Sequence, residues 1–433
     1  MLLTYKLKNG LNVATYSIPE MRSVFLWMAV KGGSIFDTKD TAGIAHFGEH
    51  LLVQGIPTLP NVEDFSNFLE SLAASYSAAT SPQYIRFSIN APAAHLSKIT
   101  RIASEVFFSP LFPQDAIERE RRVIVEEIKE KQDTLEYKIY QFFAQNRFTA
   151  NHPMQLETAG DEKVIKKLTR EDLVKWWTTY FYPENTYLVL VGGFKNDQGR
   201  QLIEEFFAKY PALEKKLEFP KFTNQYLKDR YVAIREDRKL KTTYLDLTFP
   251  SIDESQPLEE RICRALVKNI LGGLRGSRLY RLLRQRRGLV YSVGAGSIAY
   301  QRFGYAYISS QVAAEKLEEV IRLIAKELAV FYKTGPTQEE LDFAKNHHTN
   351  RALMHWDHPS AIADWIAGDL MWEDKIYIPE EYVDLVERIN LKDIREFIKK
   401  YWDFSKLGLT IQGPVENSKE NRKKFENLVA EIK

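Results

Sequence analysis

KKLTREDLVKWWTTYFYPENTYLVLVGG, residues 166–193, is the stretch that decides the fold, because a later segment repeats its pattern without a gap. The second copy is ERINLKDIREFIKKYWDFSKLGLTIQGP, residues 387–414. Each copy has a polar residue that can cap a helix, Thr169 or Asn390, followed by an apolar-periodic stretch, an aromatic residue and a β-rich run that stops at glycine. This agreement indicates one helix-then-strand unit used twice.

A duplicated chain of 433 residues predicts two homologous domains, since one hydrophobic core seldom serves more than about 250–300 residues. We expect domains at 1–212 and 226–433, joined by a linker at about 213–225, where proline and mixed charge interrupt the periodicity. Strand-like runs at 24–30, 84–90 and 242–249 are separated irregularly by helical stretches. The expected fold class is therefore α+β, with a mainly antiparallel sheet covered by helices in each domain.

Composition excludes several classes of function. The 60 basic and 58 acidic side chains nearly cancel, so we expect no binding to nucleic acid. No window approaches the roughly 18 apolar residues of a membrane span, and the start of the chain turns polar before a signal-peptide core could form, so a cytoplasmic location without membrane contact is expected. The single cysteine, Cys263, excludes an intrachain disulfide and a multi-thiolate zinc site. Any metal would be held by histidine and carboxylate.

The segment TAGIAHFGEHLLVQG, residues 41–55, predicts a short helix with two histidines on one face. Asp40 or Thr41 is expected to cap a helix that runs to about Val53. His46 and His50 then lie one turn apart and can share a metal ion.

Glu49 lies beside that face, where its carboxylate can reach a metal-bound water without occupying the metal. The spacing is H-x-x-E-H, the inverse of the zincin order. Two histidines at helical spacing are by themselves more often surface or satisfied core residues than ligands. The motif alone therefore leaves both interpretations open.

A catalytic zinc ion normally takes three protein ligands and keeps one position for water, so a third donor is needed. The segment DAIERERRVIVEEIKEKQD, residues 115–133, predicts a helix that can supply it. Its buried side is expected to consist of Ile117, Val123, Ile124 and Ile128. Glu120 and Glu127 are seven residues apart beside that side, so one can be a ligand and the other a supporting group. The alternative is that both are solvated charges.

Taken together, these segments resemble the inverzincin metallopeptidases, the family of pitrilysin, insulin-degrading enzyme and the mitochondrial processing peptidase. The resemblance is carried by GIAHFGEHLLVQG, by ERERRVIVEEIKE at 118–130 and by LGGLRGSRLYRLLRQRRGLVYSVGA at 271–295, in the family's order. With the duplicated architecture, it covers nearly the whole chain. A short two-domain member of the bacterial type is implied.

The resemblance implies one zinc ion per chain, with His46, His50 and Glu127 as ligands and Glu120 as the supporting acid. It also implies that Arg284 and Tyr291 approach the zinc site from the second, catalytically silent domain, where they would bind substrate and stabilise the oxyanion.

Two positions depart from the family's pattern. Gly48 stands where many members have a large apolar residue. Ser77, in AASYSA at 73–78, stands where the family has an asparagine associated with substrate contact. We expect Ser77 to line the substrate site, together with Tyr84 at the start of YIRFSIN, the strand to which a peptide would add.

The expected function is a zinc metalloendopeptidase that hydrolyses peptides or unfolded segments in an enclosed chamber, with Glu49 as general base for the zinc-activated water. Family members of this length pair into clamshell dimers. Because the zinc motif and the Arg284–Tyr291 pair lie in one chain, a homodimer is expected; a heterodimer with a related subunit is the alternative.

Three other interpretations stay open. The first is a non-catalytic binding or assembly subunit of a peptidase-like complex. The second is a metal enzyme of other chemistry, such as a non-haem iron oxygenase with a histidine and carboxylate triad. The third is a second metal site in the later histidine cluster, which consists of His347, His348, His355 and His358.

Overall fold

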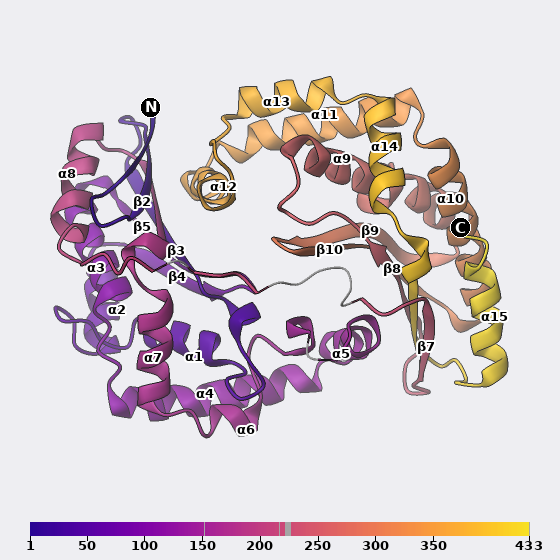
Figure 1. Cartoon of the computed structure of the whole chain (residues 1–433), viewed down its shortest axis with the longest axis horizontal. Coiled ribbons are helices and arrows are strands. Elements are labelled where there is room, and N and C mark those ends of the chain that lie inside the picture. Colours follow the sequence, from indigo (N-terminus) through magenta and orange to yellow (C-terminus); the bar gives the residue numbers. More distant parts are fainter. Residues whose placement is uncertain (151, 216, 221–226, 433) are drawn as a thin grey trace. The chain divides into compact units, whose positions relative to one another are not determined.

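A computed structural model describes residues 1–150, 152–215, 217–220 and 227–432. The chain forms two compact units, each assembled from three separate segments (Figure 1). Unit 1 comprises Met1–Asp133, Leu156–Pro220 and Met354–Tyr377, and unit 2 comprises the described residues of Thr134–Gln155, Lys221–Leu353 and Ile378–Lys433. The boundary at 213–225 stays a prediction of where the duplicated halves meet, and its residues 216 and 221–225 lie outside the described residues. Among the described residues, no helix combines the length and apolar character needed to cross a membrane.

Unit 1 contains a six-stranded sheet in the order β1-β2-β6-β3-β5-β4. Its strands are β1 (Leu2–Lys6), β2 (Asn12–Ser17), β3 (Ser23–Lys31), β4 (Ser75–Thr80), β5 (Tyr84–Pro92) and β6 (Thr186–Gly192). Strands β2 and β6 are parallel, and every other neighbouring pair is antiparallel. The expectation of a mainly antiparallel sheet is confirmed.

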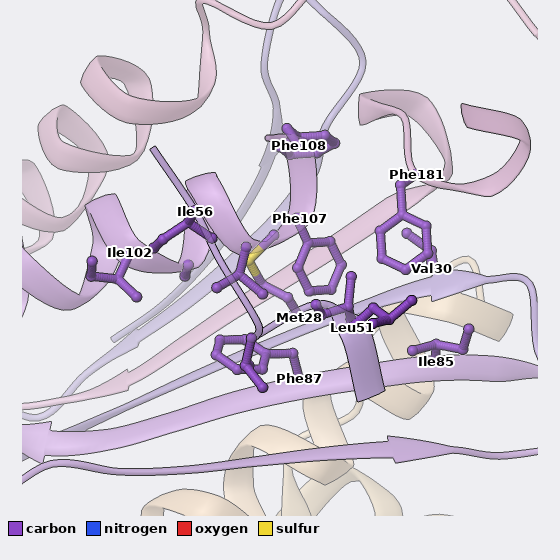
Figure 2. Close-up of a cluster of buried hydrophobic side chains, with 14 of the residues drawn as sticks. Met28, Val30, Leu51, Ile56, Ile85, Phe87, Ile102, Phe107, Phe108 and Phe181 are labelled. Carbon is purple, nitrogen blue, oxygen red and sulfur yellow. The ribbon is translucent and has the colours of Figure 1, made fainter. Parts of the chain in front are cut away.

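One face of this sheet packs against helices of the N-terminal half. These helices are α1 (Ile44–Leu51), α2 (Val62–Ser71), α3 (Leu96–Phe108), α4 (Gln114–Asp133), α6 (Glu162–Ile165), α7 (Arg170–Tyr180) and α8 (Asn196–Phe207). Unit 1 also contains α12 (Pro359–Trp372), from the C-terminal half. Alternate residues of β3 and β5, such as Met28 and Phe87, meet Leu51 of α1 and Phe107 of α3 in a buried cluster (Figure 2). This core fixes α1 against the sheet.

The opposite face of the same sheet is covered by α12, which comes from the C-terminal half of the chain. Ile362 and Ile366 of α12 pack with Trp27 of β3 and the valines of β6 in a second buried cluster. Polar contacts at both ends hold the helix. Trp27 Nε1 donates to Asp364 Oδ1 at 2.9 Å, and Lys31 Nζ donates to the carbonyl oxygen of Met371, in the last turn, at 2.7 Å. The sheet of unit 1 is therefore buried on both faces.

Unit 2 repeats this topology with a five-stranded sheet in the order β7-β11-β8-β10-β9. Its strands are β7 (Tyr231–Glu236), β8 (Thr243–Pro250), β9 (Val290–Tyr300), β10 (Phe303–Val312) and β11 (Gly408–Gly413). Its helices are α5 (Leu135–Arg147), α9 (Leu258–Lys268), the π-helical segments η6 (Asn269–Gly273) and η7 (Tyr280–Arg286), α10 (Leu317–Thr334), α11 (Gln338–His355), α13 (Pro379–Arg388), α14 (Leu391–Tyr401) and α15 (Lys419–Val429). Strands β7 and β11 are parallel and the other pairs antiparallel, as in β2-β6-β3-β5-β4.

The repeated sequence segments form the same elements, α7 with β6 and α14 with β11. Both helices begin with the predicted cap residue, and both complete a capping box: Thr169 pairs with Asp172, and Asn390 with Asp393. The two copies therefore use the same local hydrogen bonds to start the helix.

Both repeats stop at a glycine for a steric reason. Gly192 has φ +129° and Gly413 has φ +155°, in the region that favours glycine. A Cβ atom at Gly192 would lie 2.3 Å from the carbonyl oxygen of Ser23, at the start of β3. A side chain there would push the adjacent strands apart.

We predict that Ile366→Ala in α12 lowers the free energy of unfolding by about 2–5 kcal/mol, because it opens a cavity in the cluster that closes the second face of the sheet. Chemical denaturation followed by tryptophan fluorescence measures the change. Ser360→Ala, at an exposed position of the same helix, is the control and should leave stability nearly unchanged. Equal effects of the two variants would contradict the packing of α12 on this sheet.

Candidate metal centre

The helix that carries the two histidines is shorter than the sequence predicts. Its N-cap is Gly43, with φ +92°, so the predicted caps Asp40 and Thr41 are wrong. The backbone N–H of Gly43 donates to Asp37 Oδ2 at 3.0 Å, and the Thr41 hydroxyl accepts from the backbone N–H of Thr38 at 2.9 Å. A glycine in the left-handed conformation thus lets the loop turn sharply into the helix.

The donor atoms form a compact triangle. His46 Nε2 lies 3.3 Å from His50 Nε2, and Glu127 Oε2 lies 3.7 Å from His50 Nε2 and 4.0 Å from His46 Nε2. Zinc-to-ligand distances of about 2.0–2.2 Å place tetrahedral ligands about 3.3–3.6 Å apart. Two imidazoles and one carboxylate at these separations therefore fit a zinc ion, with only a small inward movement of Glu127.

Glu120 supports one of these donors from the other side of the ring. Its Oε2 lies 3.1 Å from His50 Nδ1, and its side chain is almost completely buried in α4. A carboxylate at Nδ1 favours the tautomer whose Nε2 lone pair faces the metal. His46 has no such support: its Nδ1 is buried and makes no hydrogen bond within the described part of the chain.

Burial and nearby charges shift the pKa values of the two histidines in opposite directions. Burial, with help from the neighbouring His50 and Lys131, lowers the pKa of His46 to about 3, so its imidazole is neutral and able to ligate. Burial also opposes the charged form of His50, but the hydrogen bond to Glu120 and the nearby carboxylates outweigh this and raise its pKa. A bound cation would replace that proton.

Glu49 occupies a separate position in the same cluster. Its carboxylate and the imidazoles of His46 and His50 offer ligand atoms within 4.8 Å of one another. Its Oε2 accepts a hydrogen bond from Thr80 Oγ1 at 3.1 Å. Burial raises the pKa of Glu49, as suits a group that must take up a proton. No sequence pattern pointed to Thr80, because its contact with Glu49 depends on β4 passing beside α1.

The predicted helix at 115–133 is confirmed as α4, but one residue of its predicted apolar side is wrong. Val123 is 41% exposed, whereas Val125 is buried. The buried stripe of α4 runs through Ile117, Glu120, Ile124, Val125 and Ile128. Glu120 therefore lies in the stripe itself, and Glu127 lies at its exposed border, facing the histidines.

The structure explains why position 48 is a glycine. A Cβ atom there would lie 2.0 Å from the Trp176 ring, which belongs to α7 and is almost fully buried. Helix α7 therefore approaches α1 more closely than a side chain would allow. The indole fills the volume that a large residue at position 48 would occupy.

The substrate-binding expectation for residues 84–90 has to be corrected. Strand β5 pairs with β3 on one side and β4 on the other, so it has no free edge, and Tyr84 begins an interior strand. The edge strands of this sheet are β1 and β4, and β4 contains Ser77 and ends at Thr80. Interior and edge strands of antiparallel sheets share the same alternation, so the sequence did not distinguish them.

Arg284 and Tyr291 lie together in unit 2. The guanidinium carbon of Arg284 is 5.9 Å from the centre of the Tyr291 ring, and Arg284 Nη1 donates to the carbonyl oxygen of Val290 at 3.3 Å. The Tyr291 side chain is 75% exposed. Their approach to the metal centre stays a prediction.

Within the residues that the structure describes, His46, Glu49 and His50 form a group close enough to hold a metal ion, and Glu127 lies against both histidines. The later histidine cluster does not form such a group there. His348 Nε2 lies 2.9 Å from the hydroxyl of Tyr382.

Two family descriptions match the chain. Residues 12–161 match "Insulinase (Peptidase family M16)", and residues 167–347 match "Peptidase M16 inactive domain". A solved protease from Helicobacter pylori has the same fold, with a TM-score of 0.84 and 19% identity, covering 96% of this chain and 99% of that chain.

Relatives of known sequence differ in their descriptions. An "uncharacterized zinc protease" of Rickettsia felis is 25% identical, covering 90% of this chain and 92% of that protein. The beta subunit of the mitochondrial-processing peptidase of Neurospora crassa is 25% identical, covering 95% and 88%. A "non-peptidase homolog" of Helicobacter pylori is 24% identical, covering 92% and 90%. The relatives thus include proteins described as proteases and one described as a non-peptidase homologue.

We predict that Gly48→Ala destabilises the protein by about 1–3 kcal/mol, because its Cβ overlaps the Trp176 ring. Helix propensity alone would give the opposite sign, a gain of about 1 kcal/mol. Denaturant unfolding measures the change.

Trp176→Leu provides the matched background. Once the indole is removed, Gly48→Ala should become neutral or stabilising in the double-mutant cycle. A stabilising effect of Gly48→Ala in the parent chain would contradict the close approach of α7 to α1.

We also predict that Glu120→Gln weakens zinc binding about 10- to 100-fold, because the amide supports the His50 imidazole less well than the carboxylate. Competition with a chromogenic chelator measures the affinity. Glu130→Gln, at an exposed position of the same helix, is the control and should leave the zinc affinity unchanged. Equal zinc affinity of the two variants would rule out the supporting role of Glu120.

Proposed function

The chain belongs to peptidase family M16, and from this premise we propose that it is a zinc metalloendopeptidase acting on peptides or unfolded segments. One observation carries the proposal: Glu49 stands beside a triangle of donors that fits zinc without being needed to complete it. A related protein that had lost catalysis would not need to retain such a base. The coarser assignment, a protein of the zinc protease superfamily, agrees with the descriptions of its relatives.

In the proposed mechanism, His46, His50 and Glu127 would hold the ion. When bound, zinc supplies a Lewis acid that polarises the scissile carbonyl and makes a water more acidic. Glu49 takes a proton from the attacking water as oxygen bonds to the carbonyl carbon, and returns it to the amine nitrogen as the C–N bond breaks. The Thr80 hydroxyl keeps the Glu49 carboxylate in place between the two transfers.

Substrate is proposed to bind along the free edge of β4. An extended peptide can add there as another strand, with backbone hydrogen bonds that are independent of sequence. Ser77, in this strand, would contact the peptide beside the base. Arg284 and Tyr291 are proposed to bind substrate and to stabilise the oxyanion.

Assembly is part of the proposal. Because one chain carries both the metal-binding triangle and the Arg284–Tyr291 pair, we propose a homodimer that encloses the substrate, with one zinc ion per chain. A heterodimer with a related subunit is the alternative. One relative is described as the beta subunit of a processing peptidase, so subunit pairing occurs among proteins similar to this one.

A non-catalytic binding or assembly role is the second candidate. It is favoured by a relative of similar coverage that is described as a non-peptidase homologue, and by the match of residues 167–347 to an inactive domain. The residues of the metal centre favour the peptidase, since the base and all proposed donors are present together. Peptide hydrolysis by the parent chain, compared with that of Glu49→Gln, separates the two candidate functions.

We predict that purified protein cleaves a mixed peptide library, that a chelator stops cleavage, and that Glu49→Gln lowers the rate about 100-fold or more because proton transfer is lost. Product sequencing by mass spectrometry measures cleavage. Zinc content, measured by elemental analysis, should be unchanged in Glu49→Gln because the donor triangle is intact.

Glu63→Gln, an exposed change in α2, is the control and should retain full activity. Absence of chelator-sensitive cleavage by the parent protein would support the non-catalytic candidate. Stoichiometric iron in place of zinc would support oxygenase chemistry instead.

A further inference from the structure

Unit 2 contains an open pocket of about 500 Å³ that the proposed peptidase mechanism does not use. Helix α5 forms one wall, and strands β8, β10 and β9 form the floor. The lining includes two carboxylates, Asp246 and Glu136, and the aromatic residues Tyr140, Tyr244 and Tyr307, but no lysine, arginine or histidine. The pocket is therefore acidic and aromatic.

Strand register shows how the floor is built. Asp246 of β8 pairs with Ser309 of β10, which pairs with Gly294 of β9, so all three point to the same face. The side chains of this row project little from the sheet, because serine and glycine are small. A Cβ atom at Gly294 would meet nothing within 4 Å, so the space above the row is open. The same-face row on one side of it carries Tyr307, and the row on the other side carries Tyr244. A slot between two phenol rings thus leads to a carboxylate.

The repeat shows that the slot is a change from the unit 1 plan. Trp27 pairs with Val189 in unit 1, and Asp246 pairs with Thr410 in unit 2. Val189 and Thr410 are matched positions of the duplicated segments, so Asp246 stands where unit 1 has Trp27. There the indole packs under α12. In unit 2 the shorter side chain of Asp246 replaces the indole and leaves the space above the sheet open.

The carboxylate of Asp246 has no compensating partner. No described residue donates a hydrogen bond to it or forms an ion pair with it. Burial raises the pKa of this carboxyl group to about 6, yet at neutral pH it is still mostly charged. A half-buried anion without a partner is partly desolvated at a cost, and an incoming cation would relieve that cost.

We propose that this pocket binds an organic cation with an apolar stem, an ammonium or guanidinium group of the lysine or arginine type. The cation would pair with Asp246, its stem would lie between the rings of Tyr244 and Tyr307, and Tyr140 of α5 would cover it. Glu136, exposed at the mouth, adds attraction for positive charge. The cation can come from a basic side chain of a peptide or from a free small molecule.

The peptide source rests on the proposed function, whereas cation binding itself does not. Binding is therefore measured by calorimetry on the full-length Glu49→Gln chain, which is expected not to cleave peptides. The probes are N-acetyl-arginine amide for the peptide side chain, agmatine for the free cation, and N-acetyl-norleucine amide as the uncharged control. Failure of hydrolysis and failure of cation binding are then separate results.

We expect at least one cationic probe to bind and the norleucine probe not to bind. Asp246→Asn should weaken the cation about tenfold or more, because a charge-assisted hydrogen bond is lost. Asp384→Asn, at an exposed position of the same unit, should have no effect. Gly294→Leu fills the empty row without touching the carboxylate and should abolish binding.

The stronger of the two cationic probes identifies the source. Tighter binding of N-acetyl-arginine amide assigns the pocket to a peptide side chain, and tighter binding of agmatine assigns it to a free cation. Binding that Asp246→Asn and Gly294→Leu leave unchanged would overturn the proposal, as would no binding of either cation to the parent. Far-ultraviolet circular dichroism of both variants checks that they are folded.

Discussion

Helix α1 has to be buried on three sides while it presents His46, Glu49 and His50 on the fourth, and the metal centre depends on this constraint. It contacts α4, α7 and β4, and each neighbour contributes something different. Helix α4 brings Glu120 and Glu127, strand β4 brings Thr80, and α7 brings the indole that requires Gly48. Because an eight-residue helix has little stability of its own, its position is set by this packing. The site is therefore as rigid as the surrounding core.

Much of the fold was predictable because its signals are local. The helix caps at Thr169 and Asn390, the strands at 24–30 and 242–249 and the glutamate helix all follow from residue type and periodicity. The cap of α1 was missed because Gly43 uses a left-handed turn in place of a side chain. The place of β5 in the sheet, the exchanged helix α12 and the contact of Thr80 with Glu49 depend on pairings between distant segments. A single sequence read locally carries no signal for them.

The two sheets show how a duplicated architecture can diverge by changing one face. Their strand orders correspond, and in both the face that packs on the main helical core is apolar. The other face differs. In unit 1 it carries Trp27 and is sealed by α12, whereas in unit 2 α5 reaches β11, where Gln412 Nε2 donates to the carbonyl oxygen of Ile139 at 3.0 Å, and polar residues line the rest. Duplication thus supplied a second sheet whose surface was free to acquire a different chemistry.

The origin of α12 in the C-terminal half also sets an order for folding during synthesis. The six strands of unit 1 are complete at Gly192, but the helix that covers their second face begins only at Pro359. While the intervening residues are translated, an apolar surface that includes Trp27 and Val191 has no cover from its own chain. A nascent chain that has not yet reached Pro359 therefore exposes an apolar surface of the kind that chaperones bind. Products truncated before α12 would expose the same apolar surface.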